Sequence, residues 1–194
     1  MILGVTGKIA SGKSTVMNVL SGCGFKLIYT DKIVAELYAA GAEGAALIES
    51  NFGSEFLNSD GAVNRIALRE LVFNDSVSLK KLNSVVHPIV LDVVKKQVSS
   101  FASTAGQRLG KGRKLRIAIE SSYFLPGGLL DLIDELLWVE RPRGDILSSL
   151  IARGFSESLA LQAIDLIEEP NEVDHFLLNE GDILDKIFRI FNHK

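Results

Sequence analysis

The residues most suited to chemistry are a glycine-rich stretch near the amino end, followed by a lysine and two hydroxyl side chains. Gly7, Gly12, Lys13 and Ser14 have the spacing G-x-x-x-x-G-K-[ST]. Glycine allows backbone amides to close on phosphate, and the amino end of a following helix attracts anions. The stretch therefore predicts a loop that binds the phosphates of a nucleoside triphosphate. We name it the phosphate loop (Gly7–Ser14).

Each side chain of this stretch has an expected role. Lys13 would reach the β- and γ-phosphates of ATP, Ser14 would hold Mg²⁺, and Thr15 would add a phosphate contact. An ordinary glycine-rich turn with a surface lysine is the alternative. A strand predicted at 2–5 and a helix predicted at 14–20 supply the context that favours the nucleotide site. The predicted ATP-binding residues here are Gly7, Ala10, Ser11, Gly12, Lys13, Ser14 and Thr15.

The elements that must position this loop alternate along the chain. Hydrophobic runs predict strands, and apolar residues at helical spacing predict helices between them. Pro88 is expected to start a helix, and Ser156 to cap one. The alternation predicts an α/β fold with a parallel sheet of about five strands flanked by helices. The predicted strands are 2–5, 25–29, 115–120, 135–140 and 174–178, and the predicted helices are 14–20, 32–39, 45–52, 65–73, 76–86, 89–101, 145–153, 159–167 and 183–191.

Composition limits the class of protein. The chain has 194 residues, of which 47% are hydrophobic and 23% charged, so we expect one globular domain. A net charge of −3 argues against a nucleic-acid partner. The basic stretch 108–116 is interpreted as a solvated loop that leads into a strand.

The cellular context is predicted from cysteine content and hydropathy. Cys23 is the single cysteine, which excludes an intrachain disulfide and fits a reducing compartment. Acidic residues interrupt the apolar run 129–139, so no membrane-spanning segment is expected. Strand and phosphate loop begin at once, leaving no room for a signal peptide. We expect a cytoplasmic protein without a membrane partner, as a monomer or weak homo-oligomer.

Five segments, in order and spacing, make the chain similar to the dephospho-CoA kinase family, which is related to the nucleoside monophosphate kinases. Together they span nearly the whole chain. They are Thr6–Thr15, close to T-G-G-I-G-S-G-K-S-T; Asp31, at the second aspartate of D-A-D; Asp60-Gly61 with Arg65, Leu68 and Phe73, similar to D-G-x-x-x-R-x-x-L-x-x-x-x-F; His87-Pro88; and Asn179-x-Gly181.

The resemblance implies a reaction and an architecture. ATP would phosphorylate the ribose 3′-hydroxyl of dephospho-CoA, giving CoA and ADP in the last step of coenzyme A synthesis. The fold would be a P-loop NTPase core at about 1–31, 112–140 and 172–194. A helical substrate lobe would occupy about 60–105, and a helical lid about 141–170.

The resemblance also assigns further site residues. Asp31 would act as general base, or orient Mg²⁺ through water, and it follows a strand where α/β proteins place ligands. Arg65 and His87 would bind the substrate, Arg153 would be a catalytic lid arginine, and Asn179 would bind ATP. The alternatives are a helix N-cap for Asp31 and His87, a solvated surface position for Arg65, and a cation at a helix carboxyl end for Arg153.

Three departures distinguish this chain from the family pattern. Tyr29 replaces the first aspartate of D-A-D, and Pro126 falls where D-x-P-L-L-F-E has its glutamate. Ser149 occupies the first of two lid arginine positions, and nearby Arg141 and Arg143 are candidates to substitute for it.

Two other functions stay open at this point. The chain could be a P-loop kinase for another nucleotide or small metabolite, or a nucleotide-binding homologue with impaired catalysis. A regulatory GTPase is disfavoured, because we find no N-K-x-D guanine-binding motif.

Overall fold

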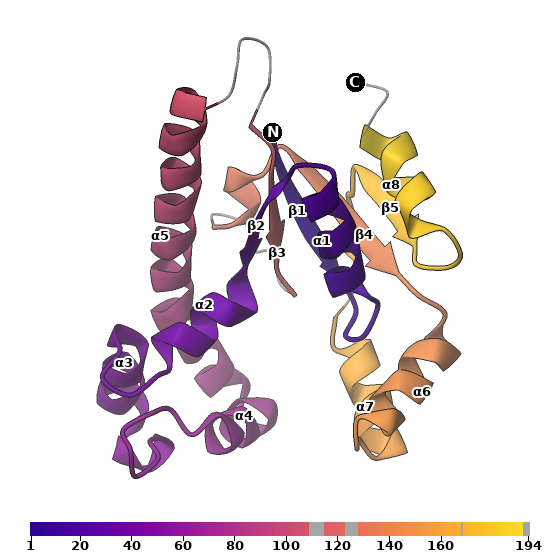
Figure 1. The fold of residues 1–194 in the computed structure, drawn as a ribbon. Helices are drawn as coiled ribbons and strands as arrows, with labels where there is room; N and C mark the ends of the chain where they lie inside the picture. Colours follow the sequence, from indigo (N-terminus) through magenta and orange to yellow (C-terminus); the bar gives the residue numbers. More distant parts are fainter. Residues whose placement is uncertain (109–114, 123–127, 168, 192–194) are drawn as a thin grey trace. The chain divides into compact units, whose positions relative to one another are not determined.

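Five strands form the centre of one of the two units into which the chain divides (Figure 1). The computed structural model describes residues 1–108, 115–122, 128–167 and 169–191. The first unit comprises Met1–Ile28 and Ser100–Lys194, and the second Tyr29–Ser99. The strands are β1 (Ile2–Gly7), β2 (Lys26–Tyr29), β3 (Ile117–Glu120), β4 (Glu135–Glu140) and β5 (His175–Leu178), in the spatial order β2-β3-β1-β4-β5.

Parallel pairing brings the carboxyl ends of these strands to one edge of the sheet. Strand β1 pairs in parallel with β3 and with β4, and β4 pairs in parallel with β5. Leu3, Val5, Leu137 and Trp138 are fully buried, as expected for strands of a parallel sheet covered on both faces. The predicted parallel α/β sheet is confirmed, and the loop residues after each strand gather at this edge, where they can build a site.

Among the described residues, four α-helices lie wholly within the first unit. They are α1 (Lys13–Gly22), α6 (Arg143–Ala152), α7 (Glu157–Asp165) and α8 (Ile183–Phe191). Helices α1 and α8 contact each other (Figure 1). Ser156 caps α7 by accepting from the Leu159 amide at 3.3 Å, which confirms the cap predicted from the sequence.

The second unit is helical. It contains α2 (Thr30–Leu37), α3 (Glu43–Phe52), α4 (Arg65–Asn74) and the first part of α5 (Ser76–Arg108). Asp75 precedes α5, and its carboxylate accepts from the Val77 amide at 3.0 Å and the Ser78 amide at 3.1 Å. Hydrogen bonds from the Ser78 hydroxyl and these amides lower the pKa of Asp75.

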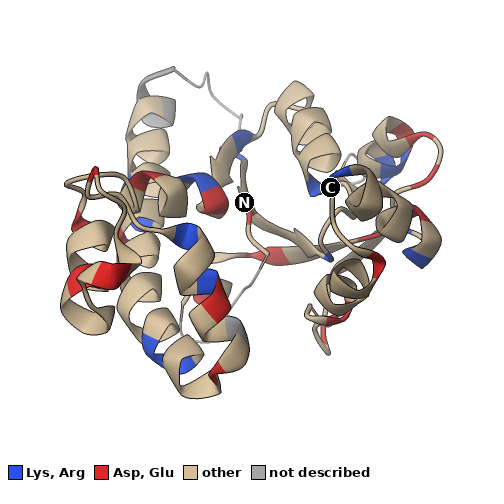
Figure 2. Ribbon diagram, turned by 90° about the horizontal axis from the view of Figure 1, so that it is seen from below, with Lys and Arg blue, Asp and Glu red and all other residues tan. Residues whose placement is uncertain are grey.

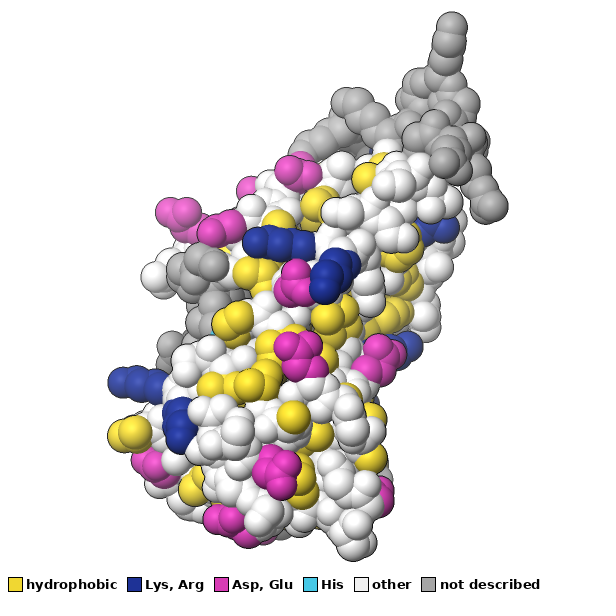
Figure 3. Space-filling view, turned by 90° about the vertical axis from the view of Figure 1, so that its left-hand side faces the viewer, with side chains coloured by type: hydrophobic (Ala, Val, Ile, Leu, Met, Phe, Trp, Pro, Cys, Tyr) yellow, Lys and Arg dark blue, Asp and Glu magenta, His cyan; other side chains and the backbone are white. Residues whose placement is uncertain are grey.

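Charged residues are distributed over both units. Lys and Arg as well as Asp and Glu are scattered over the helices (Figure 2). On the side of Figure 1 that carries α3 and α5, hydrophobic side chains lie between charged ones (Figure 3). Within the described ranges, no helix has both the length and the apolar character needed to cross a membrane.

The predicted interruption of a helix at Pro88 is wrong. The sequence placed a helix end at Val86 and a new start at Pro88, whereas α5 runs through Pro88 without a break. Proline removes one backbone hydrogen bond, but it does not prevent a helix that tertiary packing stabilises. Val86, Val90 and Val94 recur every fourth residue and are all buried, so one continuous apolar stripe spans the proline.

Candidate active site

The phosphate loop joins β1 to α1, and its backbone requires glycine at two positions. Gly7 has φ 148° and Gly12 has φ 94°. A Cβ at position 7 would lie 2.2 Å from the Val139 carbonyl oxygen, and one at position 12 would lie 1.8 Å from Asn179 Nδ2. Ala10 also has a positive φ, 57°. Neighbouring strands therefore enclose the loop closely enough to exclude side chains at Gly7 and Gly12.

Lys13 places its ammonium group over the loop. The residue is only 8% exposed, and Nζ donates to the Gly7 carbonyl at 2.9 Å and to the Lys8 carbonyl at 3.0 Å. The buried Ser11 hydroxyl oxygen has no hydrogen-bond partner among the described residues. A buried cation and an unsatisfied hydroxyl beside the amino end of α1 suit an anionic ligand with several oxygens.

Residues at the carboxyl ends of β4 and β5 hold the phosphate loop in place through hydrogen bonds. Asn179 Nδ2 donates to the Ser11 carbonyl at 2.7 Å, and the Asn179 amide donates to the Glu140 carbonyl at 2.7 Å. The Glu140 carboxylate in turn accepts from Trp138 Nε1 at 3.0 Å. The edge of the sheet thus fixes the position of the loop.

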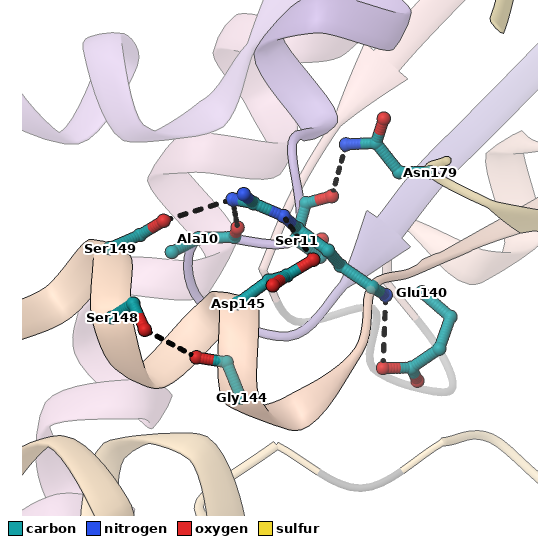
Figure 4. A network of polar contacts seen from close by, with 9 residues as sticks. Ala10, Ser11, Glu140, Gly144, Asp145, Ser148, Ser149 and Asn179 are labelled. Atoms are coloured by element: carbon teal, nitrogen blue, oxygen red, sulfur yellow. Dashed lines mark hydrogen bonds and ion pairs between the residues drawn. The ribbon is translucent and has the colours of Figure 1, made fainter. Parts of the chain in front are cut away.

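Helices α6 and α7 pack directly on the phosphate loop. Their buried core is Ile146, Leu150, Ala160 and Ile164, and Ile9 and Ala10 of the loop pack against it. From the start of the same segment, Arg141 reaches the Ala10 carbonyl and Ser149 (Figure 4). Sequence reasoning missed this packing, although two apolar residues at variable positions of the loop were a signal for it.

The other residues predicted in the first unit have these positions. Ser14 and Thr15 are exposed in the first turn of α1. Arg153 is exposed directly after α6, and its role in closing over phosphate stays a prediction. Pro126 lies outside the described residues.

Asp31 lies in the second unit and is not a helix cap. Helix α2 begins one residue earlier, at Thr30, and Tyr29 occupies the N-cap position. The alternative interpretation of Asp31 as an N-cap is therefore wrong. Its side chain is exposed in the first turn of the helix, and its role as general base remains a prediction.

A pocket in the second unit contains Arg65. Its cavity volume is about 170 Å³, and burial raises the pKa of the Tyr38 phenol in its wall, while the Arg65 charge partly opposes that shift. Two guanidinium groups and a phenol suit a ligand that is anionic and partly apolar. The lining residues are Tyr38, Arg65, Leu68, Arg69, Val72 and Leu82.

His87 lies in α5 of the same unit. Partial burial lowers the pKa of its imidazole, which favours the neutral form. Its predicted contact with substrate is untested. Across the described residues, no three or more His, Cys, Asp or Glu side chains gather in a group that could hold a metal ion.

Comparison with known proteins gives the family. The family model described as dephospho-CoA kinase matches residues 1–107, more than half of the chain. A dephospho-CoA kinase from Carboxydothermus hydrogenoformans is 32% identical over 187 residues, covering 94% of this chain and 87% of the relative. The chain belongs to the dephospho-CoA kinase family.

Another relative and two solved structures are also similar to this chain over nearly its whole length. A dephospho-CoA kinase from Nitrosospira multiformis is 29% identical over 94% of this chain and 89% of its own length. A Thermus thermophilus structure superposes with a TM-score of 0.79 at 25% identity, covering 100% of this chain and 96% of that one. Dephospho-CoA kinase from Campylobacter jejuni has the same fold, with a TM-score of 0.63 at 22% identity over 97% and 95% of the two chains.

Family membership makes the chain an enzyme. Dephospho-CoA kinases are phosphotransferases that use ATP and act in coenzyme A biosynthesis. The resemblance read from five segments of the sequence is confirmed, and so is the expected fold.

Proposed function

We propose that this chain transfers the γ-phosphoryl group of ATP to the 3′-hydroxyl of dephospho-CoA at the phosphate loop. One observation supports the site above all others. The Lys13 ammonium group lies over a loop in which the Val139 carbonyl excludes a side chain at Gly7 and a positive φ disfavours one at Gly12. That arrangement presents a fixed cation and backbone amides to a polyphosphate, as catalysis of phosphoryl transfer by positioning and charge stabilisation requires.

The chain's own residues divide the work between donor and acceptor. Lys13 and the loop amides would hold the β- and γ-phosphates, with Thr15 adding a contact and Asn179 fixing the loop beneath the nucleotide. Asp31 would accept the proton of the attacking hydroxyl. In the pocket of the second unit, which we name the acceptor pocket, Arg65 would pair with anionic groups of dephospho-CoA.

The residues of the phosphate loop also fit Mg²⁺. This ion prefers oxygen ligands and keeps several waters, so one protein hydroxyl together with phosphate oxygens suffices. Ser14 supplies an exposed hydroxyl at the start of α1. When bound there, the ion would neutralise phosphate charge.

We also propose that the chain works as a monomer or weak homo-oligomer.

A coupled assay of ADP release tests the proposal. ADP should appear rapidly only when dephospho-CoA is added to enzyme, ATP and magnesium. Adenosine, nucleoside monophosphates and small alcohols serve as competing acceptors. Rapid turnover of one of these, with none on dephospho-CoA, would identify a kinase for another metabolite.

Lys13→Ala should abolish turnover in the same assay. The variant loses the cation that the loop carbonyls position, and phosphate charge in the transition state goes unstabilised. Removing one such donor typically costs about 10²–10³-fold in rate. Unfolding temperature serves as the folding control. A correctly folded Lys13→Ala enzyme with near-normal turnover would disprove the assignment of the phosphate loop.

A further inference from the structure

Arg141 is the first residue after β4, and its guanidinium group lies against the phosphate loop. Nη1 donates to the Ser149 hydroxyl at 3.0 Å and to the Ala10 carbonyl at 3.5 Å (Figure 4). The backbone is fixed too, because the Arg141 amide donates to the Glu140 carboxylate at 3.1 Å. A cation is therefore held beside the loop that we propose binds ATP.

Among the described residues, the hydrogen-bond acceptors of this guanidinium group are neutral oxygens. It also forms an ion pair with Asp145, in which Nε and Oδ2 are 4.0 Å apart and the side chains of Arg141 and Asp145 are 32% and 58% exposed. A pair at that separation with an exposed carboxylate is weak, because water screens it. The positive charge of Arg141 thus remains available to a stronger anion.

Arg143 has a different environment, although it lies only two residues further along. Its Nη1 and Nη2 donate to the two carboxylate oxygens of Asp165 at 2.5 and 3.0 Å. Hydrogen bonding and charge in this pair raise the pKa of Arg143 and lower that of Asp165. Arg143 joins α6 to α7, and its charge is already compensated. The structure therefore separates the two arginines that the sequence left as alternatives.

Ser149 is the counterpart of Arg141. It lies on α6, is half-buried, and accepts a hydrogen bond from the guanidinium. An arginine at position 149 would bring a second positive charge to the same place, whereas a serine offers a small neutral acceptor. Ser149 and Arg141 form one arrangement, in which a cation from the end of β4 occupies the side of α6 that faces the loop.

We propose that Arg141 binds the terminal phosphates of the nucleotide in the phosphate loop, and that Ser149 orients it for that contact. A planar guanidinium presents several N–H donors that match phosphate oxygens, and only Nη1 is used in the contacts with Ala10 and Ser149. The identity of the nucleotide as ATP rests on the proposed function. The role of Arg141 does not depend on the acceptor.

A purely structural Arg141 would instead tie α6 to the loop through its two hydrogen bonds. Two substitutions separate these roles. Arg141→Gln removes the charge and keeps an N–H donor that is two bonds shorter than Nη1. Arg141→Lys keeps the charge but loses the planar fork. For a phosphate-binding residue, Mg·ATP affinity falls more in the glutamine variant than in the lysine variant while the unfolding temperatures of the two variants agree. For a structural tie, the loss of affinity follows the loss of stability.

Calorimetry of Mg·ATP binding, without any acceptor, is the test. We expect Arg141→Gln to weaken binding at least about tenfold, since a hydrogen bond to a charged group is lost. Arg141→Lys should lie between that variant and the wild type. Arg143→Gln, the matched control, should bind within about twofold of wild type, because its partner is Asp165. Ser149→Ala should weaken Mg·ATP binding less than Arg141→Gln does, because it removes only the acceptor that orients the guanidinium group.

Each outcome decides the matter. Wild-type affinity in a folded Arg141→Gln variant, or equal losses at positions 141 and 143, would overturn the role of Arg141. Wild-type affinity in Ser149→Ala would overturn the role of Ser149. If wild type binds Mg·ATP but does not phosphorylate dephospho-CoA, only the proposed function fails. If it does not bind Mg·ATP, both fail.

Discussion

Gly12 shows how single residues shape the nucleotide site. Its φ of 94° lies in the left-handed region, and Asn179 Nδ2 occupies the space that a Cβ would need. The same amide group donates to Ser11 in the loop. Position 12 is therefore constrained twice, by its own backbone conformation and by a side chain from the far end of the chain.

We expect Gly12→Ala to destabilise the fold and to weaken ATP binding. The added methyl group must displace the Asn179 side chain, and the alanine must adopt a strained backbone conformation. Each of these two effects costs of the order of 1–3 kcal/mol. Urea unfolding and calorimetry with Mg·ATP measure the two effects. Gly22→Ala, at the other end of α1, is the control, because its Cβ would meet nothing within 4 Å.

Combining Gly12→Ala with Asn179→Ala tests the cause. Removing the amide group relieves the clash but not the backbone strain. The double variant should lose less stability than the sum of the two single losses, as expected for residues in contact. Strict additivity, or a Gly12→Ala protein as stable as Gly22→Ala, would contradict this account of the loop.

The chemistry of the loop could be predicted at this scale, but its surroundings could not. Residue types and spacing indicated Lys13 and the two glycines. The contact of Asn179 with Ser11 joins residues 168 positions apart, and only the order of strands in the sheet brings them together. The contact of Arg141 with Ala10 joins residues 131 positions apart.

Helices and strands were predicted well where burial is periodic. Strand β4 at Glu135–Glu140 and helix α8 at Ile183–Phe191 have the predicted bounds. The prediction for helix α5 was wrong at Pro88. The proline was interpreted as a helix start, although buried apolar residues continue at helical spacing on both sides of it. Local propensity and tertiary packing conflicted there, and packing won.

Helix α5 also gives a pH-dependent prediction, through His87. Burial lowers the pKa of this imidazole below the ordinary value of 6.5. As the pH falls through about 6.5, the unfolded chain takes up a proton that the folded chain does not. His87 therefore reduces stability from that pH down to its lowered folded pKa, below which the penalty is constant.

Urea unfolding of wild type and His87→Gln at pH 7.5 and 5.5 measures this effect. The glutamine variant should lose less free energy of unfolding between the two pH values, since it lacks the titrating group. Carboxylates titrate equally in both proteins, so the difference reports the imidazole. Equal losses, or a larger loss in His87→Gln, would mean that burial of His87 does not control its titration.

At the scale of the whole molecule, the two substrates are assigned to different units. The sheet edge and the phosphate loop belong to the first unit, and the pocket with Arg65 belongs to the second. Each unit has its own buried residues, such as Leu137 in the first and Ile48 in the second. A change in one pocket should therefore leave binding in the other largely intact.

Arg65→Ala tests this division of labour. It removes a guanidinium from the proposed acceptor pocket, so the KM for dephospho-CoA should rise about tenfold or more, as expected for the loss of a hydrogen bond to a charged group. Mg·ATP affinity measured without acceptor should stay within about twofold of wild type. Arg189→Ala is the control, because Arg189 is exposed on α8 and pairs with Asp185 at 2.7 Å. It should change neither quantity. Weaker Mg·ATP binding with an unchanged KM for dephospho-CoA would place Arg65 at the nucleotide and refute the assignment of the second unit to the acceptor.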